Sequence, residues 1–251
     1  MNAPLPLIRS PLLAQFPHVA LAQSTRQGAD AGAPFGFNLG YGIGDDDTRV
    51  TTAIARFAER LDLDPEDLAF MKQVHGATIR EVSEPGVHDD TDAMITHLPQ
   101  VGLTVRTADC VPVMLYAPGD NLIAAVHAGW RGTAEHIAQK TAEKLIGDYH
   151  ADTSALYAFI GASAAGCCYE IGEDVAALFP EAYIIREGDG NPRLDLKALN
   201  RHQLEQAGIP SGNIEVSDLC TIHEHTLLHS YRRDADRSGR MLTTIVLREA
   251  V

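Results

Sequence analysis

Residues 103–147 read LTVRTADCVPVMLYAPGDNLIAAVHAGWRGTAEHIAQKTAEKLIG, and this stretch decides the fold of the chain. It contains three short apolar runs, rich in β-branched side chains and bounded by polar residues, proline or glycine: Leu103–Val105, Val111–Tyr116 and Leu122–Val126. Such runs are typical of buried central strands. From Thr133 onward, apolar residues recur at the spacing of one helical face, which predicts an amphipathic helix that ends at Gly147.

Strand-like and helix-like segments alternate in the rest of the chain. Apolar periodicity predicts a helix over Val50–Leu61, with the acidic run Asp45–Asp47 near its positive N-terminal end. Two further helices are expected at Glu173–Phe179 and Lys197–Gln206, and a strand at Leu68–Val74. The mixture favours an α+β fold with helices outside and sheet inside.

Composition bounds the class of protein. The chain has 251 residues, of which 45% are apolar and 22% charged, and no apolar run approaches the roughly 18 residues of a membrane span. A formal net charge of −14 argues against a nucleic-acid partner, because such proteins gain affinity from Lys and Arg. We find no repeat or flexible linker, so we expect one domain over residues 1–251, in which 1–17 is the least clearly patterned segment.

The N-terminal region and the cysteines both point to a reducing, cytoplasmic compartment. Ala20-Leu21-Ala22 superficially matches a signal-peptidase site, but Pro11 and Pro17 break the apolar core that such a signal needs. The four cysteines, Cys110, Cys167, Cys168 and Cys220, are too few and too irregularly spaced for a secreted disulfide framework. We therefore expect reduced thiols.

Three residues in short turn-like motifs are candidate metal ligands: His75, Cys110 and His127. They lie 35 and 17 positions apart, yet each stands at a predicted strand end or turn, where side chains of neighbouring strands converge on one rim of a sheet. One thiolate and two imidazoles fill three corners of a tetrahedral Zn²⁺ site and leave the fourth open, as in catalytic zinc sites. The spacing therefore favours a metalloenzyme with Cys110 and His127 at its catalytic centre.

Four further residues complete the predicted site. Asp109 directly precedes Cys110, where it could orient an imidazole or accept a proton, so we assign it a catalytic role. Arg131 stands at the start of the predicted Thr133–Gly147 helix, whose positive end favours an oxyanion. Arg232 and Arg233 add two guanidiniums, which suit phosphate, although pairing with surface carboxylates explains them equally well.

Five motifs resemble one known family over about Ser24 to Leu247: QVHG (73–76), TADCVPV (107–113), AAVHAGWRG (124–132), GCCYEIG (166–172) and SYRRD (230–234). The chain is similar to the laccase-domain or polyphenol oxidase family, also called peptidoglycan editing factor or purine nucleoside phosphorylase. The resemblance implies a single-domain, four-layer α/β/β/α sandwich with mixed sheets, and one zinc ion on His75, Cys110 and His127. It also implies phosphorolysis of adenosine, inosine and methylthioadenosine, together with adenosine deamination.

Two departures from the family pattern bear on the substrate pocket. Residues 161–166 read GASAAG where the family usually has Gly-Pro-x-Ile-Gly, and His229 follows Leu228 where an aromatic residue is common. We expect both to reshape the pocket. A nucleoside and phosphate are the predicted partners, no membrane partner is expected, and the sequence does not give the oligomeric state.

Our mechanistic hypothesis is that zinc activates an oxygen nucleophile, either phosphate at the anomeric carbon or water at the purine carbon that bears the amino group. Three alternatives stay open. A copper-dependent polyphenol oxidase would use the His₂Cys set with Met114, although only His223-Glu224-His225 fits the paired histidines that such enzymes need. Cys110 could instead be the nucleophile of a cysteine hydrolase, and a peptidoglycan-precursor editing hydrolase is the third.

Overall fold

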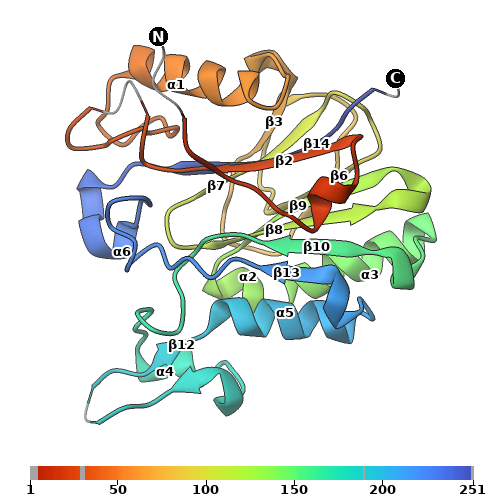
Figure 1. The fold of residues 1–251 in the computed structure, drawn as a ribbon. Coiled ribbons are helices and arrows are strands. Elements are labelled where there is room, and N and C mark those ends of the chain that lie inside the picture. Colours follow the sequence, from red (N-terminus) through yellow and green to blue (C-terminus); the bar gives the residue numbers. More distant parts are fainter. Residues whose placement is uncertain (1–4, 29–31, 189, 250–251) are drawn as a thin grey trace.

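Two six-stranded sheets, stacked face to face, form the centre of the computed structural model, which describes residues 5–28, 32–188 and 190–249 (Figure 1). The first sheet has the order β1 (Leu7–Ile8), β2 (Val19–Ser24), β14 (Met241–Leu247), β7 (Gly102–Thr107), β3 (Leu68–Met71) and β5 (Gly86–His88). The second has the order β13 (Ile214–Val216), β10 (Tyr157–Ile160), β8 (Val111–Ala117), β9 (Leu122–Ala128), β6 (Ala93–Thr96) and β4 (Ile79–Glu81). Both sheets mix parallel and antiparallel pairs.

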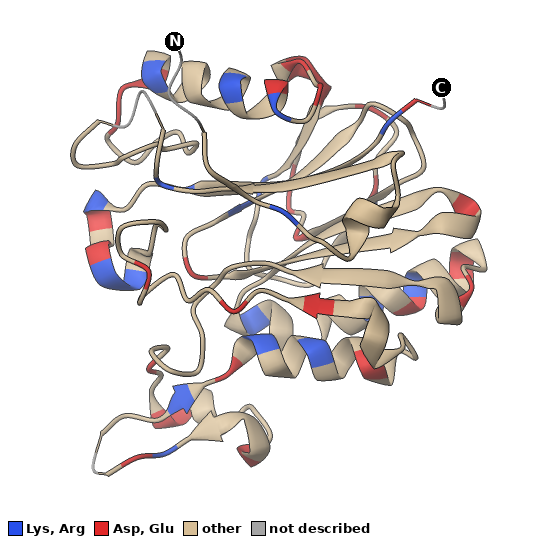
Figure 2. Ribbon diagram, in the orientation of Figure 1, with Lys and Arg blue, Asp and Glu red and all other residues tan. Residues whose placement is uncertain are grey.

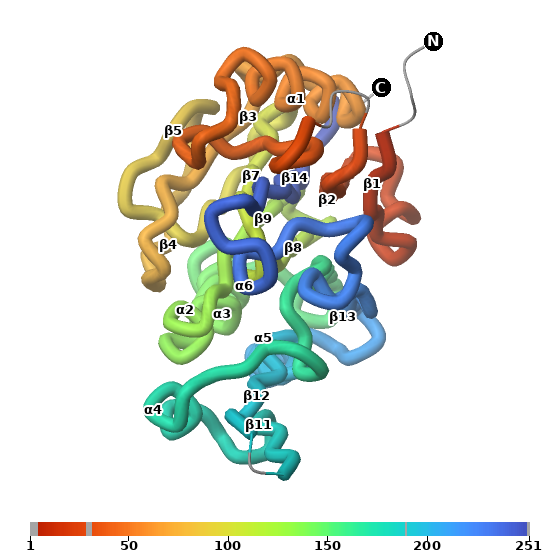
Figure 3. Tube along the Cα trace, turned by 90° about the vertical axis from the view of Figure 1, so that its left-hand side faces the viewer, coloured from red at the N-terminus to blue at the C-terminus, as the bar shows by residue number. Residues whose placement is uncertain are grey.

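Helices cover the outer faces of both sheets. Helix α1 (Asp47–Glu59) lies over the first sheet, and α2 (Trp130–Ala134), α3 (Ile137–Tyr149) and α5 (Leu196–Gln206) lie under the second (Figure 1). Helix α4 (Glu173–Ala176) and the hairpin of β11 (Ile184–Ile185) and β12 (Arg193–Leu194) protrude below α5, and α6 (Tyr231–Asp234) lies at one end of the sheets (Figures 1 and 3). Short 3₁₀ helices are Leu13–Gln15, Pro65–Asp67, Pro118–Asp120, Thr153–Ala155, Glu181–Tyr183, Ser211–Asn213 and Ala235–Arg237.

Alternation along the central strands produces the layers. In β8, Val113 and Leu115 pack with the helices beneath the second sheet, whereas Met114 and Tyr116 face the first sheet. In β2, Ala22 packs with the core under α1, while its neighbour Leu21 faces the second sheet. Since successive side chains of a strand point to opposite faces, an unbroken apolar run buries both faces. The predicted four-layer α+β sandwich is confirmed. Charged residues lie mostly on outer helices and loops, away from the central strands (Figure 2).

Most predicted elements are confirmed. The three apolar runs form β7, β8 and β9, and helices α1 and α5 match the predicted ranges to within three residues at each end. Asp46 caps α1 by accepting a hydrogen bond from the backbone amide of Arg49. None of the helices in the described residues is long and apolar enough to cross a membrane.

The predicted helix over Thr133–Gly147 is wrong in its bounds. The helical segment begins earlier, at Trp130, breaks after Ala134, and resumes as α3, which passes through Gly147 and ends at Tyr149. His136, at the break, adopts a left-handed conformation. The reason is partly tertiary: the backbone carbonyl of Thr133 accepts from the amide of His136 at 3.0 Å and from the side-chain amide of Gln203 in α5 at 2.9 Å, so both of its acceptor positions are filled.

Two other elements are shorter than predicted. Helix α4 ends at Ala176 rather than at Phe179, because the amides of Leu178 and Phe179 donate to carbonyls three rather than four residues back. Phe179 itself precedes Pro180, a position disfavoured in a helix. Strand β3 ends at Met71 rather than at Val74. The backbone amides of residues 74–76 donate to a side-chain carboxylate instead of to a neighbouring strand.

Strand register brings one end of both sheets together. Strands β3 and β7 are parallel, with Leu68 beside Gly102, so the loop after β3 lies beside the turn after β7. That turn crosses from the first sheet to the second, where β8 pairs antiparallel with β9 and places Pro112 opposite His127. The carboxyl ends of β3, β7 and β9 therefore meet at one edge of the sandwich.

Candidate metal centre and anion pocket

The three predicted ligands lie together at this edge. His75 is in the loop after β3, Cys110 is in the turn between β7 and β8, and His127 is near the end of β9. Their ligand-capable atoms all lie within 4.8 Å of one another. The two imidazole rings meet edge to face, with centroids 4.8 Å apart. Because His75 is exposed and His127 is buried, the cluster opens to solvent on one side.

A buried carboxylate, Asp92, organises both histidines. One of its oxygens accepts from Nδ1 of His127 at 2.8 Å and from the backbone amide of His75 at 3.0 Å. The other accepts from the amides of Val74 and Gly76 at 3.2 and 2.8 Å. These bonds leave Nε2 of His127 as the free ring nitrogen, and they hold His75 at a positive φ of 62°.

Electrostatics favour an ionised thiol at Cys110. Burial raises the pKa of this thiol, but the adjacent His127 and His75 outweigh burial and lower the pKa to about 6. Burial lowers the pKa of His127, whereas Cys110 and Asp92 raise it, and the balance brings it to about 9. The sulfur is thus a thiolate at neutral pH, the form in which cysteine binds metals.

Two neighbouring residues of the motifs have clear positioning roles. A Cβ atom on Gly129 would lie 3.2 Å from the Cys110 sulfur and 3.2 Å from Cδ2 of His75, so only glycine leaves the donors room. The side-chain amide of Gln73 pairs with both backbone groups of Arg106 in β7, at 2.8 and 2.9 Å. Gln73 thereby fixes the His75 loop to the neighbouring strand.

A cavity of about 560 Å³ opens directly onto the three ligands. Five cationic side chains line it, each from a different segment of the chain: Lys72, Arg106, Arg131, Arg232 and Arg240. The rings of Trp130, Tyr169 and Tyr231 also line it, and Asp109 is the single carboxylate in the lining. In a chain with a net charge of −14, this concentration of positive charge favours an anionic ligand.

Three of these cations, Lys72, Arg106 and Arg240, were missed by the sequence analysis. Burial, and then the charge of Arg240, lower the pKa of Arg106, whose Nε is buried without a hydrogen-bond partner in the described structure. Arg240 donates to the carbonyls of Ser238 and Gly239. Two mutually repelling guanidiniums in one cavity are stabilised by a bound anion. Lys72 and Arg106 directly precede the motifs QVHG (73–76) and TADCVPV (107–113), which was the one signal available in the sequence, whereas Arg240 adjoins no such motif.

The predicted anion-binding residues have different positions. Arg131 is exposed, lies in the cavity wall and stacks over the Trp130 ring at 4.2 Å. Arg232 lies over the Tyr169 ring at 4.9 Å and donates to the carbonyl of Glu170. Helix α2 is too short to provide the helix-end charge predicted beside Arg131, so side chains supply the positive field.

Arg233 does not line the cavity, and its predicted role in phosphate binding is not supported. Its guanidinium donates to the carbonyls of Thr221, Ile222 and Leu228 and pairs with Asp234. It therefore anchors the loop before α6.

Asp109 also differs from the expectation. Its carboxylate accepts from the Thr221 hydroxyl at 2.7 Å and from the backbone amide of Arg232 at 2.6 Å. The carboxylate that contacts an imidazole in the described structure is Asp92. The sequence signal for Asp92 was an acidic residue directly before the apolar run of β6, but that signal is weak.

The departures from the family pattern lie behind the cavity rather than in its lining. His229 is buried, and its Nε2 donates to the carbonyl of Phe37 at 3.1 Å. Burial lowers the pKa of His229 to about 4, so the ring is neutral. His229 therefore does not line the cavity, and its effect on the shape of the pocket stays a prediction. In the 161–166 loop, the amide of Ala162 is bound to the Gln23 side chain.

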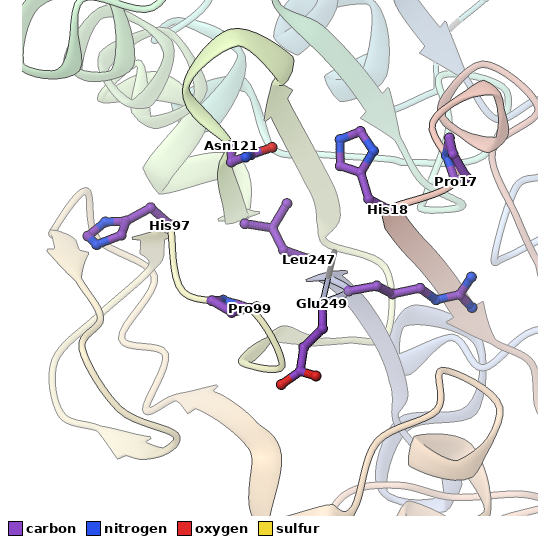
Figure 4. Close-up of a pocket in the computed structure, with 8 residues that line it drawn as sticks. Pro17, His18, His97, Pro99, Asn121, Leu247 and Glu249 are labelled. Atoms are coloured by element: carbon purple, nitrogen blue, oxygen red, sulfur yellow. The ribbon is translucent and has the colours of Figure 1, made fainter. Parts of the chain in front are cut away.

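A second cavity, of about 750 Å³, lies at the opposite ends of the strands (Figure 4). Asn121, which precedes β9, and Leu247, which ends β14, contribute to its lining, as do His18 and His97. None of the three-donor metal clusters in the described residues includes a residue of this cavity. The cluster of His75, Cys110 and His127 is therefore the better candidate for a reaction centre.

Comparison with known proteins gives consistent matches over nearly the whole chain. A model of the family described as multi-copper polyphenol oxidoreductase laccase matches residues 20–248. A purine nucleoside phosphorylase of Deinococcus radiodurans is 40% identical over 98% of this chain and 95% of its own length. The adenosine deaminase RL5 of an unknown prokaryotic organism is 34% identical over 84% of this chain and 86% of its own.

Solved structures match the fold equally well. The crystal structure of YlmD from Geobacillus stearothermophilus superposes with a TM-score of 0.91 and 34% identity, and covers 99% of this chain and 98% of that one. The architecture described above is therefore shared by a solved relative.

Proposed function

This chain belongs to the multi-copper polyphenol oxidoreductase laccase family, and from that membership we propose that it is a zinc-dependent purine nucleoside phosphorylase. The proposed substrates are adenosine, inosine and methylthioadenosine with phosphate, and adenosine deamination is a proposed accompanying activity. The supporting observation is an open set of three metal-ligating side chains beside a cavity lined by guanidiniums. Relatives named purine nucleoside phosphorylase and adenosine deaminase support an enzyme of purine metabolism.

The donor set fits a catalytic zinc ion. His75, Cys110 and His127 supply two nitrogens and one sulfur, and the described residues contribute no fourth donor to this cluster. Zinc with three protein ligands keeps one position for water or substrate. The room left by Gly129 and the carboxylate of Asp92 on His127 are the features that such a site requires. When bound, zinc would supply Lewis-acid chemistry at the cavity floor.

The cations of the cavity bind and orient phosphate in this proposal. Arg106 has a buried Nε without a partner in the described structure, and Arg240 lies close enough to lower the pKa of Arg106. Guanidiniums bind phosphate oxygens with two hydrogen bonds each, which fixes the orientation of the anion. A phosphate oxygen then attacks the anomeric carbon of the ribose. The glycosidic bond breaks, its electron pair leaves with the purine, and ribose 1-phosphate forms.

Aromatic rings are suited to hold the purine. Trp130, Tyr169 and Tyr231 line the same cavity, and a guanidinium lies over each of the three rings. A purine ring stacks on such faces because its π system is flat and polarisable. In deamination, water replaces phosphate and attacks the ring carbon that bears the amino group, and ammonia leaves.

The proposal is tested by metal content and product analysis. We expect wild-type protein to carry zinc and to release hypoxanthine from inosine only with phosphate. His75→Ala and Cys110→Ala should lose both zinc and activity. His97→Ala, an exposed change in the remote cavity, should keep both. Phosphorolysis by a metal-free Cys110→Ala protein would refute the scheme.

Metal identity and the other open mechanisms are tested with the same preparations. Oxygen uptake with a phenol by the copper-loaded protein, but not by the zinc-loaded protein, would favour the polyphenol oxidase alternative. Neither His223 nor His225 belongs to a three-donor cluster in the described structure. Rapid alkylation of Cys110 in zinc-loaded protein, with activity insensitive to chelators, would favour the cysteine hydrolase.

A further inference from the structure

A second cluster of donors lies apart from the proposed zinc site and consists of thiols alone. The sulfurs of Cys167, Cys168 and Cys220 all lie within 4.8 Å of one another, and those of Cys167 and Cys168 are 3.4 Å apart. All three are free thiols. The proposed function uses none of them.

Two segments, far apart in sequence, build this cluster. The backbone amides of Cys168 and Tyr169 both donate to the carbonyl of Ala165, and this turn presents the two adjacent cysteines together. The segment of Cys220 is fixed beside them, because the amide of Thr221 donates to the carbonyl of Ser163 at 3.0 Å. The backbone thus brings the thiols together without help from a bound ion.

The surroundings stabilise negative charge on the buried sulfur. Burial raises the pKa of the Cys220 thiol, but backbone amides of Ala165, His223 and Ile222 donate to it and bring the pKa below its ordinary value. The buried ammonium of Lys197 donates to the carbonyls of Ser217 and Leu219 at 2.7 and 3.2 Å. Burial lowers the pKa of Lys197, and Cys220 is the strongest of the groups that raise it again.

The other two thiols resist ionisation as long as no cation is present. Burial raises the pKa of Cys167, and burial together with its thiol neighbours raises that of Cys168 to about 12. Three thiolates at this spacing repel one another, so they ionise together only around a positive ion. Metal binding would release the thiol protons to solvent.

We propose that Cys167, Cys168 and Cys220 form a second metal site, selective for a thiophilic monovalent cation of the Cu⁺ type. A cation about 2.3 Å from each of three sulfurs in one plane holds the sulfurs about 4 Å apart, and the three sulfurs here lie 3.4 Å apart for Cys167 and Cys168 and no more than 4.8 Å apart for any pair. Thiolates select Cu⁺ and Zn²⁺. Zinc with three protein ligands belongs to a substrate cavity, which these sulfurs do not line, and structural zinc takes a fourth protein ligand, which the described residues do not add here. Cu⁺ is therefore favoured.

The exposure of the three cysteines allows an ion to reach the site from solvent. Cys167 is exposed, Cys168 is partly exposed and Cys220 is buried, so an ion enters from solvent and ends against the buried sulfur. The site adjoins the cavity without sharing its ligands. Tyr169, which follows Cys168, lines the cavity, and Thr221, which follows Cys220, donates to Asp109.

The test titrates the full-length protein, without oxygen, with Cu⁺ held by a chromophoric Cu⁺ chelator. We expect wild-type protein to withdraw one Cu⁺ equivalent that Cys110→Ala also withdraws. Cys167→Ser and Cys220→Ser should each bind this equivalent more weakly by at least the ~10–100-fold that loss of an outer-shell partner costs. Since Cys167 is exposed, Cys167→Ser keeps the test valid if Cys220→Ser fails to fold.

X-ray absorption at the copper edge gives an independent count of the sulfur atoms bound to copper. It is measured on Cys110→Ala, because this variant lacks the sulfur of the proposed zinc site. Three sulfur neighbours would support the proposal. Nitrogen neighbours, unchanged Cu⁺ affinity in Cys167→Ser, or a Zn²⁺ ion that excess Cu⁺ does not displace would each overturn it. Cu⁺ binding to Cys110→Ala does not depend on the proposed zinc site. The second metal site can therefore fail this test while the proposed phosphorolysis holds, and the reverse is equally possible.

Discussion

Replacing Asp92 by asparagine tests the idea that one carboxylate positions both histidine ligands. In the wild-type protein its two oxygens accept four hydrogen bonds, three from backbone amides and one from His127. Asparagine has nearly the same shape but replaces one oxygen by an NH₂ group. Whichever way the amide turns, two of the four donors then face a donor.

The expected magnitudes follow from this count. Each buried donor left unsatisfied costs about 1–3 kcal/mol, and either two amides or, if the His127 ring switches tautomer, one amide stays unsatisfied, so Asp92→Asn should lower the free energy of unfolding by about 1–6 kcal/mol. If the NH₂ group faces His127, the ring accepts at Nδ1 and carries its proton on Nε2, where it blocks metal binding. We expect zinc affinity to fall by about 10–100-fold, as for lost outer-shell partners.

The assay measures zinc affinity by competition with a chromophoric chelator, and stability by urea unfolding of metal-free protein. Glu215→Gln is the matched control, because this remote carboxylate accepts from the Ser10 hydroxyl and the Leu12 amide. It should lower stability and leave zinc affinity unchanged. Wild-type zinc affinity in Asp92→Asn would refute the positioning role, whatever its stability.

Three other changes have defined outcomes. Gly129→Ala places a methyl group 3.2 Å from the Cys110 sulfur and should weaken zinc binding by about 10-fold, measured by the same competition. Arg106→Gln should lower kcat/KM for phosphate by about 10–100-fold in steady-state phosphorolysis, because that factor corresponds to the free energy of one lost hydrogen bond to a charged group. The pKa of His229 is about 4 in the folded protein and 6.5 in the unfolded chain, so the unfolded chain binds more protons between these two pH values. The free energy of unfolding therefore decreases as the pH is lowered from 6.5 to 4. His229→Phe should reduce this loss by about 3 kcal/mol in urea unfolding between pH 7 and pH 4.

Each of these changes has a control or a contradicting result. Gly147→Ala, in α3 with no atom near the new methyl group, should raise stability by about 0.5–1 kcal/mol and leave zinc binding intact. Arg248→Gln, which loses only a surface pair with Asp62, should leave phosphate kinetics unchanged. An unaltered pH slope in His229→Phe would contradict the assignment of a buried neutral imidazole.

Local patterns in the sequence predicted most elements and the nature of the metal donors. Apolar runs such as Val111–Tyr116 are buried on both faces, and that burial is encoded residue by residue. The helix Lys197–Gln206 follows in the same way from its apolar periodicity. The sequence also indicated that the three ligands stand at strand ends, which is where the structure has them.

Local sequence patterns could not predict contacts between residues of separate segments. Asp92, Arg106 and Arg240 reach the site only because of how the strands are ordered. The break at His136 likewise depends in part on Gln203, which contacts Thr133 from another helix. Competition between a helical hydrogen bond and a distant side chain is not visible in the sequence of the helix.

The sequence by itself determined which segments are strands and helices and which side chains can bind a metal, since both depend on residue type and short-range spacing. Only the tertiary structure decided that β7 and β8 belong to different sheets, that Asp92 holds both histidines, and that Arg106 and Arg240 share the cavity. The physical reason is that tertiary contacts join residues that are far apart in the sequence. Strand order and register are set by packing the apolar faces of whole sheets, and they bring together residues that no local pattern connects.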